Sequence, residues 1–366
     1  MPVKAVRPSP KTAKAVLTAS AACRRAKGTG DGRREKHHNG GVMKIAAVQL
    51  DVAFAGVDEN LRRCEALIGE AAGAGAVLIV LPEFFATAIG FSDLMLDAVI
   101  KNAAVPPVML RWAARHDVII GGSNIILSGG EAYNRFDLVF PDGQVFSHGK
   151  DIPTQFENCY YTAGDKSYIL HTPIGAVGVA LCWEMIRYDT LRALAGRADI
   201  ILAGSCWWDL PLDAPPEREP LRAYNQALAR NTPAIFAKLA GIPLVHANHC
   251  GLVTASDFPG ATKRQTRRLV GAAQIVDYTG AVLAGKPFSD GPGFVMADVS
   301  WENNSGQAPG YPPGYWIPDL PDSYIRAWET LGPQGRDYYE RVSRPYYSEH
   351  RQNKPVKSYS SDVDCC

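Results

Sequence analysis

The feature that most constrains the fold is a short run of aliphatic residues at 77–81, with the sequence VLIVL. A run with no polar residue on either face is typical of a strand buried on both sides, as in parallel sheets covered by helices. Other strand-like runs alternate with amphipathic helical stretches along the chain, and Pro141-Asp142-Gly143 indicates a hairpin. This alternation predicts a mixed-sheet α/β domain over residues 43–300.

The predicted elements of this domain follow from apolar periodicity and from the turn residues between them. The strands are expected at 44–50, 77–81, 118–126, 133–140, 144–148, 168–170, 176–181, 199–203, 234–239, 272–277, 281–284 and 294–299. The helices are expected at 58–72, in a region ending near 115, at 186–196 and at 217–231. The uncharged run 167–183 contains His171 and Pro173, and it is predicted as two strands around a turn rather than as a membrane span.

The two ends of the chain differ from the domain in composition. Residues 1–42 contain ten Lys or Arg against two acidic residues, so they carry +8, whereas the whole chain carries +1 and residues 43–366 therefore carry −7. We expect residues 1–42 to form a disordered basic leader that is dispensable for chemistry. The acidic remainder argues against a nucleic-acid partner. Residues 301–366 are rich in Pro, Tyr and Trp, and predict a tail with one helix at 322–331 that packs on the domain or at a subunit interface.

Several classes of site are excluded by the motifs that the chain lacks. The eight cysteines contain no C-x-x-C pair, and a low cysteine content in a long chain favours reduced thiols and a cytoplasmic location. The segment 280–286 resembles a phosphate loop, but Pro287 stands where Ser or Thr would bind magnesium. His246 and His249 have no carboxylate spaced to complete a metal site, so they are interpreted as pocket or hydrogen-bonding residues. We therefore expect no metal and no cofactor.

Three chemically active residues follow directly after predicted strands. Glu83 stands between Pro82 and Phe84, and apolar surroundings would raise its pKa and suit it to act as a base and an acid near neutral pH. Lys150 follows the strand 144–148, where its ammonium can stabilise an oxyanion. Cys182 ends an apolar strand before a predicted helix, whose N-terminus would lower the pKa of the thiol. A base, a cation and a nucleophile at strand ends predict covalent acyl transfer.

These segments resemble the nitrilase, or carbon–nitrogen hydrolase, superfamily. The resemblance covers about residues 43–300 and rests on KIAAVQLDV, LPEFF, YNRFDLVFPDGQV leading to GK, and LCWE, in that order. It implies a four-layer α-β-β-α sandwich, a catalytic triad of Glu83, Lys150 and Cys182, and a second glutamate, Glu157, that orients Lys150 or the substrate. It also implies independence from metals and assembly as a homodimer or a larger homo-oligomer.

The resemblance implies a cofactor-independent hydrolase of a non-peptide carbon–nitrogen bond in a small-molecule amide or N-carbamoyl compound. A nitrilase that converts a nitrile to an acid and ammonia is the alternative, and a catalytically silent interaction protein on the same fold is a further one. Aromatic residues near the triad predict an aromatic or flat substrate pocket formed by Trp183, Trp207, Trp208 and Phe84. Arg187 either binds a substrate carboxylate or lies on the first turn of the helix after Cys182.

Overall fold

The computed structural model describes residues 42–256, 258, 261–301 and 306–351. All of them belong to one compact unit, His38–Cys366. The expected leader, except for Val42, and the last residues of the expected tail lie outside the described residues.

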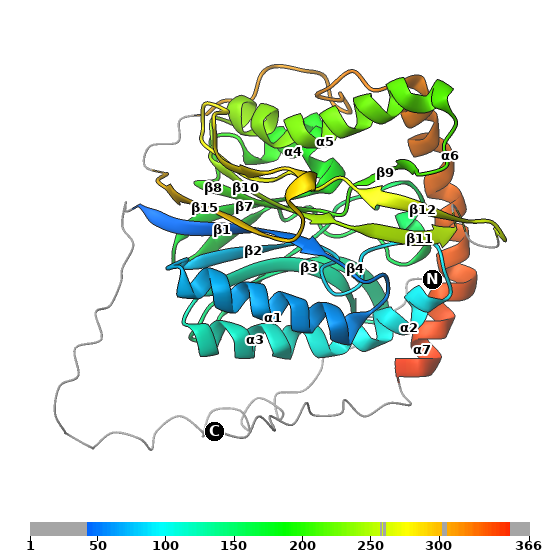
Figure 1. The fold of residues 1–366 in the computed structure, drawn as a ribbon, viewed down its shortest axis with the longest axis horizontal. Coiled ribbons are helices and arrows are strands. Elements are labelled where there is room, and N and C mark those ends of the chain that lie inside the picture. Colours follow the sequence, from blue (N-terminus) through cyan, green and yellow to red (C-terminus); the bar gives the residue numbers. More distant parts are fainter. Residues whose placement is uncertain (1–41, 257, 259–260, 302–305, 352–366) are drawn as a thin grey trace, which may run out of the picture. The chain divides into compact units, whose positions relative to one another are not determined.

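Twelve of the described strands form one large mixed sheet with two halves (Figure 1). In the first half the order is β5 (Val145–Gly149), β4 (Glu131–Val139), β3 (Ile119–Ser128), β2 (Leu78–Glu83) and β1 (Met43–Asp51), and β15 (Gly293–Val299) pairs antiparallel with β1. In the second half the order is β10 (Leu244–Cys250), β8 (Ile200–Ser205), β7 (Gly175–Leu181) and β6 (Ile169–Thr172), and β13 (Ala273–Val276) and β14 (Val282–Lys286) extend from β10. Parallel pairing of β1 with β10 through Gln49 and Asn248 joins the halves.

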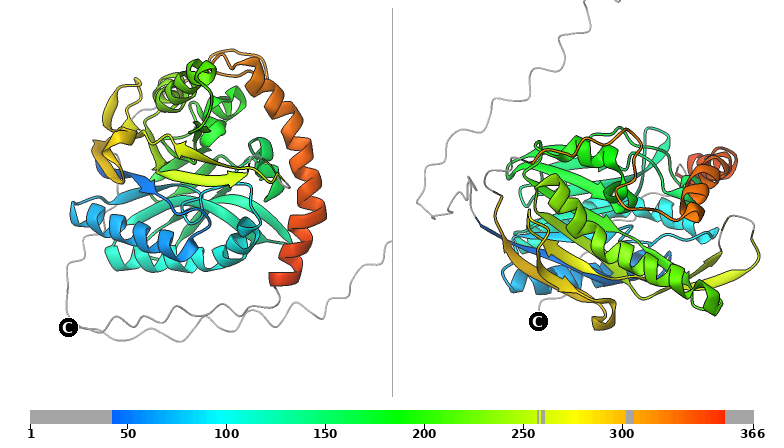
Figure 2. Two further views of the ribbon diagram at one scale, coloured as in Figure 1. Left: turned by 45° about the vertical axis from the view of Figure 1, so that its right-hand side comes forward. Right: turned by 90° about the horizontal axis from the view of Figure 1, so that it is seen from above.

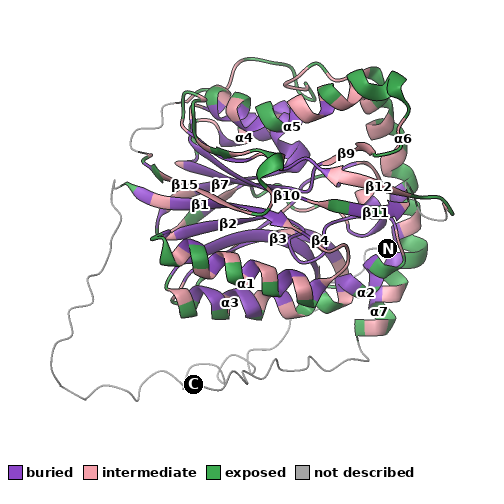
Figure 3. Ribbon diagram, viewed as in Figure 1, coloured by how far each residue is buried: buried purple, intermediate pink, exposed green. Residues whose placement is uncertain are grey.

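Helices cover the outer face of each half, which gives four layers (Figures 1 and 3). The first half carries α1 (Val57–Gly73), α2 (Leu94–Lys101) and α3 (Val105–His116), and the second carries α4 (Tyr188–Leu194) and α5 (Glu219–Ala240). One buried hydrophobic cluster lies between the two halves. A second lies between the first half and its helices, and a third between the second half and its helices. The predicted four-layer α-β-β-α sandwich is confirmed.

The alternation of side chains along β2 explains why its sequence is wholly apolar. Leu78 and Val80 belong to the cluster between the halves, whereas Ile79 and Leu81 belong to the cluster under the helices. Successive side chains of a strand point to opposite faces, so a strand between two cores requires apolar residues at every position. Helix α1 has a single buried face, and its apolar residues accordingly recur at helical spacing, as at Leu61 and Ile68.

Two predicted elements of the second half are wrong. Residues 234–239 form the last turns of α5 rather than a strand, and this helix ends at Gly241, which adopts a left-handed conformation with φ of +66°. The strand that follows it is β10, which the sequence did not predict. The helix predicted at 186–196 is divided into a 3₁₀ turn, Cys182–Ile186, and the shorter α4.

The C-terminal segment forms a long helix along one edge of the sandwich (Figure 2). It consists of α6 (Asp322–Tyr338), a π-helical turn (Tyr339–Ser343) and α7 (Arg344–Arg351). It packs against the 3₁₀ turn Gln155–Cys159, where Asn158 Nδ2 donates to Gly332 O at 3.2 Å and Ser343 Oγ donates to Cys159 O at 2.5 Å. A small sheet of β11 (Leu252–Ser256), β12 (Arg264–Leu269) and β9 (Trp208–Pro211) lies beside the main one. None of the described helices has the length and apolar character needed to cross a membrane.

Candidate active site

Four of the residues singled out from the sequence meet beside one end of the two half-sheets. Glu83 is the last residue of β2, Lys150 follows β5, and Glu157 lies on the 3₁₀ turn after it. Cys182 follows β7 in the other half. The carboxyl ends of strands that run in the same direction lie at the same edge of a sheet, so side chains that are distant in the sequence converge there.

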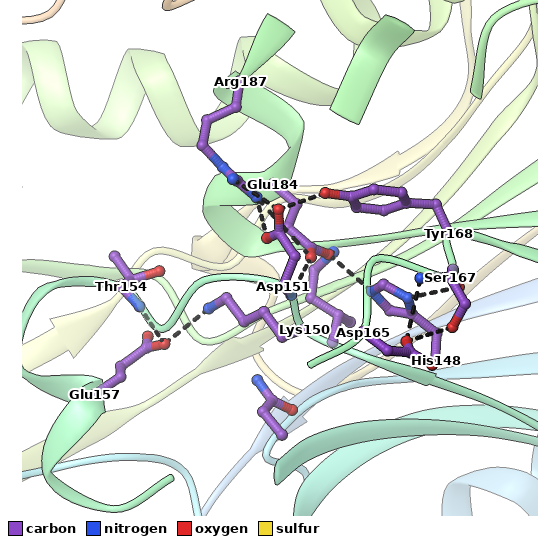
Figure 4. A network of polar contacts seen from close by, with 12 residues as sticks. His148, Lys150, Asp151, Thr154, Glu157, Asp165, Ser167, Tyr168, Glu184 and Arg187 are labelled. Carbon is purple, nitrogen blue, oxygen red and sulfur yellow. Dashed lines mark hydrogen bonds and ion pairs between the residues drawn. The ribbon is translucent and has the colours of Figure 1, made fainter. Parts of the chain in front are cut away.

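Lys150 lies between the two glutamates. Its Nζ donates to Glu83 Oε1 at 2.9 Å and to Glu157 Oε2 at 2.8 Å, and the lysine is almost fully buried (Figure 4 draws the Glu157 contact). Glu157 Oε2 also accepts from Thr154 N at 3.0 Å and from the Tyr161 hydroxyl. These contacts use two of the three donors of the ammonium and leave one for a ligand.

Glu83 is held by Asn134 and Cys206, which sequence analysis did not single out, and by His249, which it interpreted as a pocket or hydrogen-bonding residue. Its Oε1 also accepts from Asn134 Nδ2 at 2.8 Å, and its Oε2 accepts from Cys206 N at 3.1 Å. His249 Nε2 donates to the Glu83 carbonyl oxygen at 2.7 Å. Burial raises the pKa of Glu83 to about 7, against the opposing effect of Lys150. This carboxylate therefore has the fixed position and the pKa that a general base needs near neutral pH.

The pKa of the Cys182 thiol is shifted in the direction opposite to the one predicted from the sequence. Burial raises the pKa of Cys182 well above its ordinary value, and the negative charge of Glu83 adds to the increase while Lys150 opposes it. The predicted lowering by a helix N-terminus is wrong, because a 3₁₀ turn of five residues offsets too little of the desolvation cost. The residue has φ of +50°, a conformation that costs about 1–3 kcal/mol for a side chain other than glycine. The thiol therefore needs a base to become a nucleophile.

A cavity of about 370 Å³ opens onto Cys182 and Glu157, whereas Glu83 and Lys150 are not among its described lining residues. Cys182 and Glu157 line it together with Trp183, Trp207 and Trp208, the three tryptophans predicted to bind substrate. Its remaining described lining residues are Ile89, Phe91, Thr154, Gln155, Phe156, Cys206, Asp209, Leu210, Pro211, Arg218, Leu221, Asn225, Arg267 and Tyr324.

Phe84 is not among the described residues that line this cavity. Its ring is fully buried and lies 6.0 Å from the ring of Tyr161, centroid to centroid. Successive side chains along an extended chain point in different directions, so Phe84, which follows Glu83, points into the core. The expectation that Phe84 forms a wall of the pocket is not supported.

Comparison with known protein families identifies the family of this chain. The family model for the carbon–nitrogen hydrolases matches residues 44–302. The chain belongs to the carbon–nitrogen hydrolase family. Membership makes it an enzyme of the nitrilase superfamily, as the sequence motifs predicted.

Curated relatives of this carbon–nitrogen hydrolase have different activities. An omega-amidase of Danio rerio is 31% identical over 166 residues, which are 42% of this chain and 59% of that protein. A nitrilase of Pyrococcus abyssi is 26% identical over 189 residues, which are 50% of this chain and 71% of that protein. The chain thus spans less than two thirds of the length of the omega-amidase.

Solved structures share the fold of this carbon–nitrogen hydrolase. A carbon–nitrogen hydrolase from Helicobacter pylori G27 matches with a TM-score of 0.61 and 18% identity, covering 73% of this chain and 90% of that chain. An amidase from Nesterenkonia sp. matches with a TM-score of 0.54 and 20% identity, covering 71% and 91%. The predicted nitrilase-type α/β fold is confirmed.

A second buried polar network of the hydrolase lies beside the triad residues (Figure 4). Arg187 donates to Asp151 through both terminal guanidinium nitrogens, from Nη1 to Oδ2 at 2.9 Å and from Nη2 to Oδ1. Glu184 accepts from Asp151 N at 2.9 Å and from Leu181 N at 2.7 Å, and it lies 3.2 Å from His148 Nε2. Arg187 is therefore engaged by Asp151, just before the first turn of α4, rather than directed at a substrate carboxylate.

The two histidines of β10, His246 and His249, are buried and hydrogen-bonded. Burial lowers the pKa of both His246 and His249 to about 4, so both are neutral near pH 7. His246 Nε2 lies 2.9 Å from Ser205 Oγ. Within the part of the chain that the structure describes, no three His, Cys, Asp or Glu side chains converge as a metal site requires.

Proposed function

We propose that this protein hydrolyses a non-peptide carbon–nitrogen bond in a small-molecule amide or N-carbamoyl compound, through a thioester on Cys182. The observation that carries the proposal is the contact of Lys150 with both Glu83 and Glu157 beside Cys182 at the cavity. A buried ion cluster is expensive to maintain, and a perturbed carboxylate in a cleft is typical of a catalytic site.

In the first step Glu83 takes the proton from the Cys182 thiol as the sulfur forms a bond to the amide carbon. The raised pKa of the thiol means that proton transfer must accompany attack, and a base with a pKa of about 7 suits this transfer. The third N–H of Lys150 and the backbone N–H of Trp183 stabilise the oxyanion. The carbon–nitrogen bond then breaks, and the amine or ammonia leaves with the proton from Glu83.

In the second step water releases the acid. Glu83 takes a proton from a water molecule, whose oxygen attacks the thioester carbon. The carbon–sulfur bond then breaks as Glu83 returns the proton to the sulfur, which restores both the thiol and the base. Glu157 holds Lys150 in place throughout, because its carboxylate accepts from Nζ at 2.8 Å. Thr154 N and the Tyr161 hydroxyl fix Glu157 in turn.

A nitrilase is the second candidate, and similarity to the nitrilase of Pyrococcus abyssi favours it. The same thiol, base and ammonium serve attack on a nitrile carbon. A catalytically silent interaction protein is a third candidate, for which a buried charged cluster beside a cavity would have no use. Assembly as a homo-oligomer and a cytoplasmic location stay predictions.

Ammonia release from a panel of amides, N-carbamoyl compounds and nitriles tests the proposal. We expect turnover with an amide or N-carbamoyl compound, and an acyl adduct that peptide mass spectrometry locates on the peptide that contains Cys182. The variant Cys182→Ala should lose turnover and adduct while keeping the native circular dichroism spectrum. Comparable turnover in that variant would refute the assignment of the nucleophile. Turnover of nitriles alone would favour the second candidate, and inactivity on all three classes the third.

A further inference from the structure

The C-terminal segment is hydrogen-bonded to the turn that carries the nucleophile. Tyr188 N donates to Tyr315 O at 3.0 Å, and Ile317 N donates to Ile186 O at 2.9 Å. Arg187 and Trp316 are bridge partners between these two bonds. The chain around Trp316 therefore runs antiparallel beside the residues that directly follow the Cys182 turn.

Three aromatic side chains of this segment surround Trp183, the residue after Cys182. The rings of Tyr324 and Trp328 lie stacked near Trp183, with centroids at 6.0 and 5.8 Å and interplanar angles of 25° and 11°. Trp316 contacts Trp183 edge-on at 5.9 Å and Trp328 at 5.1 Å. We call Trp316, Tyr324 and Trp328 the aromatic cage. Stacked and edge-on aromatic pairs add to the energy of burial, so the cage restrains the ring of Trp183.

The cage is also tied to the wall of the cavity. Tyr324 lines the cavity, and its hydroxyl donates to Asn225 Oδ1 at 3.1 Å. The same oxygen accepts from Trp207 Nε1 at 3.0 Å. One amide oxygen thus fixes two aromatic walls, one from the C-terminal helix and one from the domain. The cage residues lie beyond residues 44–302, which the family model matches.

Restraint of Trp183 matters because of its place in the chain. Its backbone N–H is a donor for the oxyanion in the proposed mechanism, and it follows a cysteine in a left-handed conformation. A strained backbone persists only where its surroundings hold it. We propose that Trp316, Tyr324 and Trp328 are positioning residues that hold Trp183, and through it the Cys182 backbone, in the geometry required for acyl transfer. This inference rests on the proposed function, but it concerns residues that the mechanism does not use directly.

Substitution of Trp328 tests the inference. We expect Trp328→Ala to lower kcat on the order of 10²-fold with little change in KM, because a small displacement of reacting groups has an effect of this size. Trp328→Phe keeps a ring for stacking and should recover most of the lost kcat. Tyr346→Ala removes an aromatic residue of the same C-terminal helix that contacts Asp97 and His350 instead, and it should leave kcat unchanged.

Alkylation of Cys182 by iodoacetamide near pH 7 gives a second measurement that needs no substrate. We expect slower alkylation in Trp328→Ala than in the native protein and in Tyr346→Ala, because the thiol is less well aligned with its base. If Trp328→Ala does not fold by circular dichroism, Trp328→Leu replaces it, since leucine fills space without a ring. Loss of kcat and slower alkylation are expected of that variant too.

The outcomes separate this inference from the proposed function. Unchanged kcat and alkylation in a folded Trp328→Ala or Trp328→Leu, or a rise in KM alone, would overturn the positioning role. Faster alkylation would also overturn it, because the cage would then act only as a cover. If the native protein releases no ammonia from any substrate, the proposed function fails, and the alkylation rates still decide the inference.

Discussion

The charge of Glu157 should set the pH at which the proposed base becomes active, and Glu157→Gln removes that charge at nearly constant volume. Glu157 and Glu83 accept from the same Lys150 nitrogen at 2.8 and 2.9 Å, so their oxygens lie at most about 5.7 Å apart. A neighbouring negative charge disfavours ionisation of Glu83 and raises its pKa. Removing that charge should therefore lower the pKa of Glu83.

The size of the change follows from Coulomb's law. Two unit charges about 5.7 Å apart, at an effective dielectric constant of about 20, repel by about 3 kcal/mol. This energy corresponds to about two pH units, at about 1.4 kcal/mol for each unit. Because each charge is spread over a carboxylate, we expect a decrease of about one to two pH units from the present pKa of about 7.

The pH profile of kcat/KM measures this change. The acid limb reports the pKa of a base in the free enzyme, so it should move from near pH 7 to lower pH in Glu157→Gln. The turnover at the optimum should also decrease, because Lys150 loses an ionic partner. Glu70→Gln, an exposed position on α1, should leave the limb in place. An acid limb that stays at its native pH, or moves to higher pH, in Glu157→Gln would refute the electrostatic argument.

Three further substitutions test other parts of the structure. Arg187→Met leaves the buried Asp151 carboxylate without its ionic partner and should lower the free energy of unfolding in urea by about 3–5 kcal/mol. Gly204→Ala places a methyl group 2.7 Å from the backbone nitrogen of Glu83, so kcat should fall by more than KM changes. Burial alone would lower the pKa of His148, but Glu184, Ser167 and Asp151 raise it above its ordinary value. His148 therefore stabilises the folded protein below about pH 6.5, and this stability is lost as the pH rises through its folded-state pKa. His148→Gln should remove this pH dependence in urea titrations.

Matched controls distinguish these effects from general damage. Arg192→Met breaks an exposed ion pair on α4 and should change the free energy of unfolding by less than about 1 kcal/mol. Gly73→Ala adds a methyl group where no atom lies within 4 Å, so kcat should be unaffected. His171→Gln changes an exposed histidine and should keep the native pH dependence of stability. Equal losses in a variant and its control would contradict the corresponding argument.

The first half of the sandwich was predictable because β1 and β2 are largely aliphatic and Pro141-Asp142-Gly143 marks the hairpin of β4 and β5. The second half was less so. Strand β10 is interrupted by His246, Asn248 and His249, which hydrogen-bond inside the protein but have the polarity of loop residues. Residues 234–239 are as apolar as a strand, and Pro233 before them suggests a boundary, although the helix continues through it. Periodicity in a short apolar run does not separate the two structures.

The site was predictable in the same uneven way. Residues at or directly after the end of a strand, such as Glu83 and Lys150, are found from the position of the strand. Asn134 lies within β4, and its contact with Glu83 depends on strand register, which the sequence does not specify at that position. The contact of Tyr324 with the cavity depends on the path of the C-terminal segment. The raised pKa of Cys182 depends on the burial of its thiol by residues distant in the sequence. Such long-range contacts carry no local signal.

The division of the sheet has a consequence for folding. Glu83 and Lys150 come from the half that contains β2 and β5, whereas Cys182 comes from the half that contains β7. The ion pair of Asp151 with Arg187 and the contact of His148 with Glu184 also join the two halves. A chain emerging from the ribosome, or refolding from urea, therefore holds a cysteine without a base until the halves dock. The appearance of hydrolytic activity during refolding would therefore mark the step at which the two halves are joined.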